Sequence, residues 1–170
     1  MQDLDIETEL QHIGEIAIIG PTGSAKYHFI HSLCRKPIIT DHDIIFGRYD
    51  VNPELSLFLY GIGYEYERVN FAWDLVANKI LGYIVLFDWY NDQSFKMAQN
   101  ILDFLTAEFD APITVAADVF DRPFPVQTSI FRPSISLSHQ TQFTFCRSNN
   151  PASVKKVVIS LLDMLINRLS

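Results

Sequence analysis

Residues 20–27 have the types and spacing of a loop that holds phosphate. They read GPTGSAKY and follow the apolar run Glu15–Ile19. In the phosphate-loop template G-x-x-x-x-G-K-[ST], backbone N–H groups and the first turn of a helix surround phosphate oxygens, and the lysine neutralises the outer phosphates. Gly20 and Lys26 match the template, and Gly23 lies within the turn. The segment therefore predicts a phosphate-binding turn between a strand and a helix.

Two positions of this segment depart from the template. Ala25 replaces the second glycine, so a Cβ narrows the space for phosphate and costs about 1 kcal/mol if the backbone needs a positive φ. Tyr27 replaces the serine or threonine that coordinates Mg²⁺, and its phenolic oxygen lies too far from the backbone to take that role. Metal-dependent hydrolysis is therefore in doubt. The alternative interpretation is that residues 20–26 form only a turn from strand to helix.

Other residues with reactive side chains favour structural interpretations. The sequence Asp41-His42-Asp43 contains metal-ligand types, but alternate residues of a strand point to opposite faces, so we interpret it as a solvated loop. Asp88 ends a buried apolar run and is interpreted as structural. A group of aromatic residues is expected in loops near the phosphate turn, where it suits a protein interface. This group comprises Tyr60, Tyr64, Tyr66, Trp89 and Tyr90.

Strand-like and helix-like segments alternate around these residues. We expect strands at Glu15–Ile19, Ile44–Tyr49, Leu55–Tyr60, Gly82–Phe87, Ile113–Ala117 and Gln142–Cys146, and helices at Ala25–Leu33, Glu67–Asn78, Asp92–Phe109 and Ala152–Leu169. Turn formers at 50–53 join the second and third strands as a hairpin, and 118–139 is expected to be mostly loop. The pattern predicts one α/β domain over residues 1–170. Its sheet has about six mostly parallel strands, one antiparallel edge strand, and helices on both faces.

Composition narrows the classes of partner and the compartment. The net charge is -7 without a basic stripe, which argues against nucleic acid as a partner. The apolar run Ile80–Phe87 is too short to span a bilayer, so no membrane insertion is expected. Residues 1–10 lack the features of a signal peptide, and Cys34 and Cys146 have no motif spacing. These features predict a cytoplasmic protein with reduced thiols.

The sequence resembles the Ras superfamily of small GTPases over about Ile16 to Leu169. It is most similar to the prokaryotic Ras-like group that includes gliding-motility GTPases and GTPases associated with roadblock-fold partners. The most specific stretch is ERVNFAWD at 67–74, followed by LGYIVLFD at 81–88. These segments resemble the family's G-Q-E-R-F-x-x-x-W and L-G-A-I-V-L-V-D. The resemblance implies a Ras-like P-loop fold.

The resemblance also implies which family positions have changed. The family's D-x-x-G falls at 62–65, so Glu65 replaces the glycine that meets the γ-phosphate, and its carboxylate repels phosphate. Tyr66 replaces the glutamine that orients water. The base-reading N-K-x-D falls at 118–121, where Asp121 is retained and Val119 replaces the lysine that packs over guanine. The family's last loop falls near Cys146-Arg147-Ser148, and Thr40 is the candidate for its metal-binding threonine.

Two functions follow from this pattern of loss and retention. Altered positions are Ala25, Tyr27, Glu65, Tyr66 and Val119, and residual nucleotide-binding positions are Gly20, Gly23, Lys26 and Asp121. The first function is a pseudo-GTPase without catalytic or metal-binding residues, which binds a roadblock-fold, polarity or signalling protein. The alternative is a divergent switch that binds GTP or GDP weakly without Mg²⁺ and hydrolyses GTP slowly or only with a partner. A small-molecule enzyme lacks a supporting acid, base or nucleophile arrangement.

Overall fold

The computed structural model describes residues 12–21, 23–39, 44–65, 68–69, 79–125 and 140–169. Its elements in chain order are β1 (His12–Gly20), α1 (Gly23–Leu33), β2 (Ile38–Ile39), β3 (Ile45–Asn52), β4 (Leu55–Glu65), β5 (Arg68–Val69), β6 (Gly82–Asp88), α2 (Asp92–Glu108), β7 (Ile113–Asp118), β8 (Thr141–Cys146) and α3 (Pro151–Arg168). The six expected strands and three of the four expected helices are confirmed, with ends that differ by a few residues.

The strands form one mixed sheet in the order β2-β3-β4-β1-β6-β7-β8. Strands β4, β1, β6, β7 and β8 run parallel to one another, whereas β3 runs antiparallel to both β4 and β2. The expected hairpin and antiparallel edge are therefore confirmed. The sheet is wider than expected because the short strand β2 pairs with the beginning of β3. Two isolated residues give too little alternation to predict a strand from sequence.

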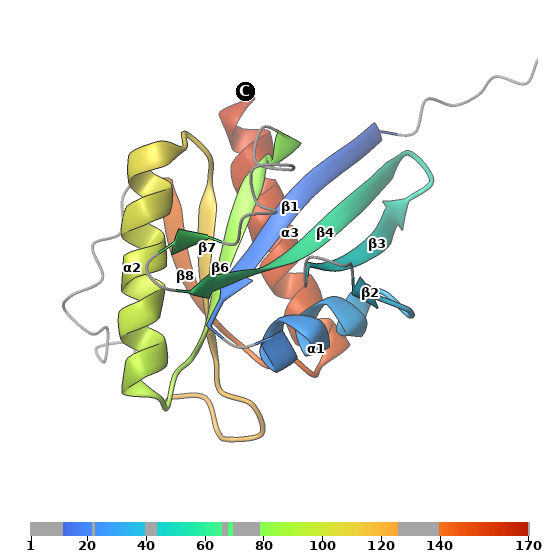
Figure 1. The fold of residues 1–170 in the computed structure, drawn as a ribbon. Helices are drawn as coiled ribbons and strands as arrows, with labels where there is room; N and C mark the ends of the chain where they lie inside the picture. The colour runs from blue at the N-terminus through green and yellow to red at the C-terminus, as the bar shows by residue number, and fades with distance from the viewer. Residues whose placement is uncertain are drawn as a thin grey trace, which may run out of the picture.

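Helices cover both faces of the sheet, as expected (Figure 1). Helix α2 packs on one face, and α1 and α3 pack on the other. Alternate residues of β1 serve the two layers, since Ala17 and Ile19 contact the α2 side while Ile16 and Ile18 contact the α1 and α3 side. A strand buried on both faces needs a continuous apolar run, which explains the composition of β1 and β6.

The helix expected at Glu67–Asn78 is wrong at its beginning. Arg68 and Val69 form β5, which pairs antiparallel with Glu65 and Tyr64 at the end of β4. The spacing of apolar residues that includes Val69 predicted a helix, but Val69 pairs instead with Tyr64, which lies only a few residues earlier in the chain. The remaining residues of that expected helix, 67 and 70–78, lie outside the described residues, as do Thr40, the segment 41–43 and Tyr66.

The carboxyl ends of β1 and β6 form a switch point in the sheet. β1 lies between β4 and β6, and the helices that follow β1 and β6 leave toward opposite faces. In open α/β sheets, ligand crevices form where neighbouring strands connect in this way. In Figure 1 the beginnings of α1 and α2 and the loop after β7 all lie toward the lower edge of the view. No helix of the described residues is long and apolar enough to cross a membrane.

Both cysteine thiols are buried in the core beneath α1 and α3. Burial, with a smaller contribution from Asp50, raises the pKa of Cys34 to about 11. Burial and then the charge of Asp118 raise the pKa of Cys146. The thiolate is the reactive form of cysteine, so both groups are expected to be inert in the folded protein.

We therefore expect the native protein to react with neither cysteine in a disulfide-exchange assay at pH 8. Both thiols should react at once after unfolding in guanidinium chloride, which is the matched control. A rapid release of one equivalent of chromophore from the folded protein would contradict the buried position of Cys34 or Cys146.

Candidate functional site

A cavity of about 280 Å³ lies at the switch point, beside the predicted phosphate turn. It is bounded by the turn after β1, the end of β6, the first turns of α2 and the loop after β7. Its lining residues are Pro21, Ala25, Leu86, Phe87, Asp88, Asn91, Gln93, Ser94, Met97 and Phe120. The position matches the expected ligand crevice of an open α/β sheet, so we take it as the candidate site.

Lys26 is turned into its own loop. Its side chain is only 4% exposed, and Nζ donates a hydrogen bond to the carbonyl oxygen of Gly20 at 2.5 Å. A buried ammonium group is stable only when it is hydrogen-bonded, and the loop carbonyl satisfies part of that need. The two template residues that match best are thus joined to each other. A phosphate would have to compete with this contact for the lysine.

Gly20 is required by packing, whether or not phosphate binds. A Cβ at this position would lie 2.4 Å from the carbonyl oxygen of Leu86 on β6. That distance is far below van der Waals contact, and the neighbour is backbone, which cannot rotate away. The glycine therefore permits the close approach of β1 and β6. Its match to the template is not by itself evidence of a phosphate site.

The expected backbone cost at Ala25 does not arise. Ala25 lies within α1 and is buried, and the single positive φ outside glycine in the described residues belongs to Phe120. Alanine is the residue best suited to a helix, so its backbone is unstrained. The Cβ of Ala25 still narrows the cavity, because Ala25 lines the cavity where a glycine would leave more space.

Tyr27 lies along α1 and away from the cavity. Its ring stacks on His31, one helical turn later, with centroids 5.7 Å apart, and the side chain packs against the core beneath α1 and α3. Residues four apart share a helix face, which accounts for this pairing. Tyr27 is absent from the cavity lining. The side chain of Glu65 lies outside the described residues, although its backbone ends β4.

The segment 118–121, which the resemblance aligns with a base-reading motif, presents different groups from those of that template. Asp118 is fully buried at the end of β7, where its Oδ1 accepts hydrogen bonds from the backbone N–H groups of Phe120 at 2.9 Å and Ser148 at 3.2 Å. Val119 is also fully buried and packs into the core on the α2 side. Asp121 is exposed in the turn that follows. Phe120 is the member of this segment that lines the cavity.

Phe120 has a strained backbone conformation, with φ at 55°. A bulky side chain in the left-handed region costs about 1–2 kcal/mol, so the surroundings must hold it there. Asp118 fixes the N–H of Phe120, and Arg147 Nη1 donates to the carbonyl oxygens of Phe120 at 2.6 Å and Arg122 at 2.7 Å. From the sequence, residues 118–121 were predicted only as an altered base-reading motif. The interleaved aromatic and arginine residues of FDRPF at 120–124 were the available signal.

The expected group of loop aromatics is wrong at two of its members, whereas Trp89 and Tyr90 lie in the turn after β6 as expected. Tyr60 and Tyr64 lie in β4, and Trp89 is buried, with its ring edge against Phe145 at 4.9 Å. The hydroxyl of Tyr60 donates to Glu15 at 2.7 Å, and burial, followed by this contact, raises the pKa of Tyr60. Among the members whose side chains are described, Tyr90 is the exposed one.

Polar groups of the cavity wall form hydrogen bonds with nearby backbone N–H groups. Asp88 Oδ1 accepts a hydrogen bond from the N–H of Tyr90 at 2.9 Å, and Ser94 Oγ accepts one from the N–H of Asp88 at 2.8 Å. The side chain of Asn91 caps α2 by accepting from the N–H of Ser94 at 3.0 Å. These contacts support a structural role for Asp88, as the sequence indicated. Within the described residues, no group of three His, Cys, Asp or Glu side chains is arranged to hold a metal ion.

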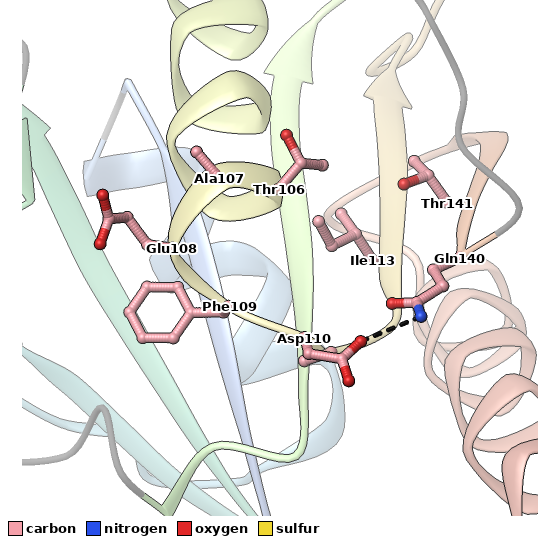
Figure 2. Close-up of a pocket in the computed structure, with 9 residues that line it drawn as sticks. Thr106, Ala107, Glu108, Phe109, Asp110, Ile113, Gln140 and Thr141 are labelled. Carbon is pink, nitrogen blue, oxygen red and sulfur yellow. Dashed lines mark hydrogen bonds between the residues drawn. The ribbon is translucent and has the colours of Figure 1, made fainter.

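A second hollow of about 450 Å³ lies at the opposite edge of the sheet, between the end of α2 and the beginnings of β7 and β8. Figure 2 shows Asp110 and Gln140 meeting there, with Gln140 Nε2 donating to Asp110 at 3.0 Å. Asp110 also pairs with Arg168 at 2.6 Å. These contacts join the end of α2 to β8 and α3. Its described lining residues include no nucleophile hydrogen-bonded to an activating base, so we do not take the hollow as the candidate site.

Comparison with known proteins does not assign a family. No protein-family model matches the chain, and no curated protein matches it either.

Proposed function

We propose that this chain is a Ras-like P-loop domain that acts as a protein–protein interaction module, a pseudo-GTPase, in signalling or polarity. The observation that carries the proposal is the buried hydrogen bond from Lys26 to Gly20. In a working phosphate loop this lysine contacts the outer phosphates. Here its ammonium group already has a partner within the loop.

Two features of the fold support descent from a P-loop domain. The turn after the central strand β1 leads directly into α1 and lies at the switch point of a mostly parallel sheet. This is the position where α/β proteins bind ligands. The strand, turn, lysine and helix also occur in the order that the phosphate-loop template requires.

Two features support the loss of nucleotide handling. Tyr27 packs along α1 and does not line the cavity, so its hydroxyl is poorly placed for a metal ion there. Val119 is fully buried, so it cannot take the place of the lysine that packs over the base in the family. A domain that has lost nucleotide handling can still bind another protein through its surface. The partner class suggested by the resemblance is a roadblock-fold, polarity or signalling protein.

Nucleotide binding measured by calorimetry tests this proposal. We expect the purified protein to carry no GTP or GDP, and to bind neither with a Kd below about 1 μM, equivalent to about 8 kcal/mol, in the presence of Mg²⁺. The matched comparison is the double variant Ala25→Gly/Tyr27→Ser, which restores the phosphate-loop template and is expected to bind more tightly than the natural sequence. Submicromolar binding of Mg²⁺-GTP by the natural sequence would refute the pseudo-GTPase function.

The cavity beside Pro21 and Ala25 favours a second candidate function, a divergent switch that holds GTP or GDP weakly without Mg²⁺. A ligand that binds the folded state raises Tm with its concentration. This function therefore requires GDP to raise the Tm of the natural protein and to have a smaller effect on Lys26→Ala. If GDP leaves both melting temperatures unchanged, the switch is excluded and the interaction module remains.

A further inference from the structure

Five residues at the carboxyl edge of the sheet form a surface that we call the Phe120 platform: Tyr90, Phe120, Arg122, Phe124 and Arg147. We propose that this platform docks a protein segment in which an Asp or Glu stands next to an apolar side chain. The inference rests on the proposed interaction module and names the surface and the chemistry of its partner. The loop that carries most of the platform lies at the lower edge of the sheet in Figure 1.

The loop at 119–124 contains two unfavourable features at the same place. Phe120 has a left-handed backbone, and Asp118 Oδ2 is buried without accepting a hydrogen bond from the described residues. Either feature lowers stability, and strain of this kind persists where the surrounding structure enforces it, most often at functional sites. The result at this loop is an aromatic ring brought to the surface, with Phe120 36% exposed.

The platform is rigid because its side chains hold one another. Arg147 binds two carbonyl oxygens of the loop and lies over the ring of Phe124, 4.2 Å from its centroid. The hydroxyl of Tyr90 donates to the carbonyl oxygen of Pro123 at 3.1 Å. Fixed aromatic side chains lose little entropy when a partner binds. Phe124 and Tyr90 are nevertheless 44% and 43% exposed, so their rings are available for contact.

Arg122 supplies the charge that defines the partner. Its guanidinium lies 4.5 Å from the centroid of the Tyr90 ring, and no described residue accepts a hydrogen bond from it. Stacking on an aromatic face fixes the plane of the guanidinium and leaves its edge free to bind a carboxylate in a bidentate manner. The exposed rings beside it favour an apolar contact. A segment with adjacent acidic and apolar side chains complements both, whereas a phosphate ion would leave the rings uncovered.

A selection of random peptides displayed on phage tests the proposal directly. The immobilised natural protein is expected to enrich peptides with Asp or Glu next to a large apolar residue. A synthetic peptide of the selected sequence should then lose affinity by at least about tenfold for Arg122→Gln and for Phe120→Gly. Glycine adopts the left-handed backbone without strain, so Phe120→Gly removes the ring and keeps the loop folded.

Two control variants carry comparable changes elsewhere on the surface. Arg35→Gln removes an exposed arginine, and Ile166→Ala trims an apolar side chain that is exposed on α3. Both should bind the peptide as the natural protein does. Equal binding to Phe120→Gly, a selected sequence without acidic residues, or the absence of any enriched sequence would overturn the docking surface.

Competition experiments separate this inference from the proposed function. Displacement of the peptide by GTP or GDP below about 1 μM would refute both, because the edge would then be a nucleotide site. Failure to select peptides, with no nucleotide binding, would refute the platform alone. A single-stranded oligouridylate that binds through Arg122 and the same rings would also overturn a protein partner, because such surfaces can stack bases.

Discussion

Replacing Gly20 with alanine is expected to reduce the free energy of unfolding by about 3 kcal/mol, the upper part of the usual range for overpacking. The added Cβ would lie 2.4 Å from the carbonyl oxygen of Leu86, so β1 and β6 would have to separate. These strands form the centre of the sheet, and both are buried on the two faces. Urea unfolding followed by circular dichroism measures the change.

Gly63→Ala is the matched control for this experiment. Gly63 is the register partner of Gly20 on the neighbouring strand β4, and a Cβ there would meet nothing within 4 Å. We expect its free energy of unfolding to change by no more than about 0.5 kcal/mol, since surface changes of this kind are nearly neutral. If Gly20→Ala changed the free energy of unfolding as little as Gly63→Ala, packing would not explain Gly20. Its match to the phosphate-loop template would then again be evidence of a phosphate site.

Replacing Asp118 with alanine is expected to destabilise the protein by about 3 kcal/mol. The substitution removes the acceptor of the buried N–H group of Ser148 and of the part-buried N–H group of Phe120, and a buried donor without an acceptor costs about 1–3 kcal/mol. The loss is reduced in part because the unpartnered Oδ2 is removed with the rest of the carboxyl group. Chemical denaturation again provides the measurement.

Asp118→Asn separates the hydrogen bonds from the charge. Asparagine keeps an oxygen acceptor for both N–H groups, but its amide N–H donors take the place of the unpartnered Oδ2, so we expect a loss of about 1–2 kcal/mol, smaller than that of the alanine variant. An asparagine variant as unstable as the alanine variant would show that the retained oxygen acceptor does not stabilise the loop at 119–124. A stable alanine variant would show that the two hydrogen bonds contribute little.

Much of the α/β architecture could be predicted from local sequence patterns. The apolar runs of β1 and β6 indicated buried strands, because both faces of such strands are covered by helices. The turn formers at 50–53 indicated the hairpin that makes β3 antiparallel to β4. Asn91 and Asn150 at the beginnings of α2 and α3 are helix caps, a signal carried by residue type alone.

Two very short strands and the full length of β4 could not be predicted from the sequence. β2 exists because Ile38 and Ile39 pair with the beginning of β3, and β5 exists because Arg68 and Val69 pair with the end of β4. Tyr60 was expected in a loop, but β4 continues past it to Glu65. In each case pairing between strands overrides a local pattern that is too short to be decisive.

The turn that was predicted to bind phosphate shows most clearly what the sequence determined by itself. It placed a strand, a glycine-bearing turn, a lysine and a helix in order, because residue types and spacing carry that information. The tertiary structure decided what those residues do: Gly20 makes room for β6, and Lys26 donates to Gly20. The strained conformation of Phe120 was likewise invisible in sequence, since contacts from β7 and from the loop after β8 impose it. The contact from Arg147 joins residues that are 27 positions apart in the chain, and local patterns contain no record of it.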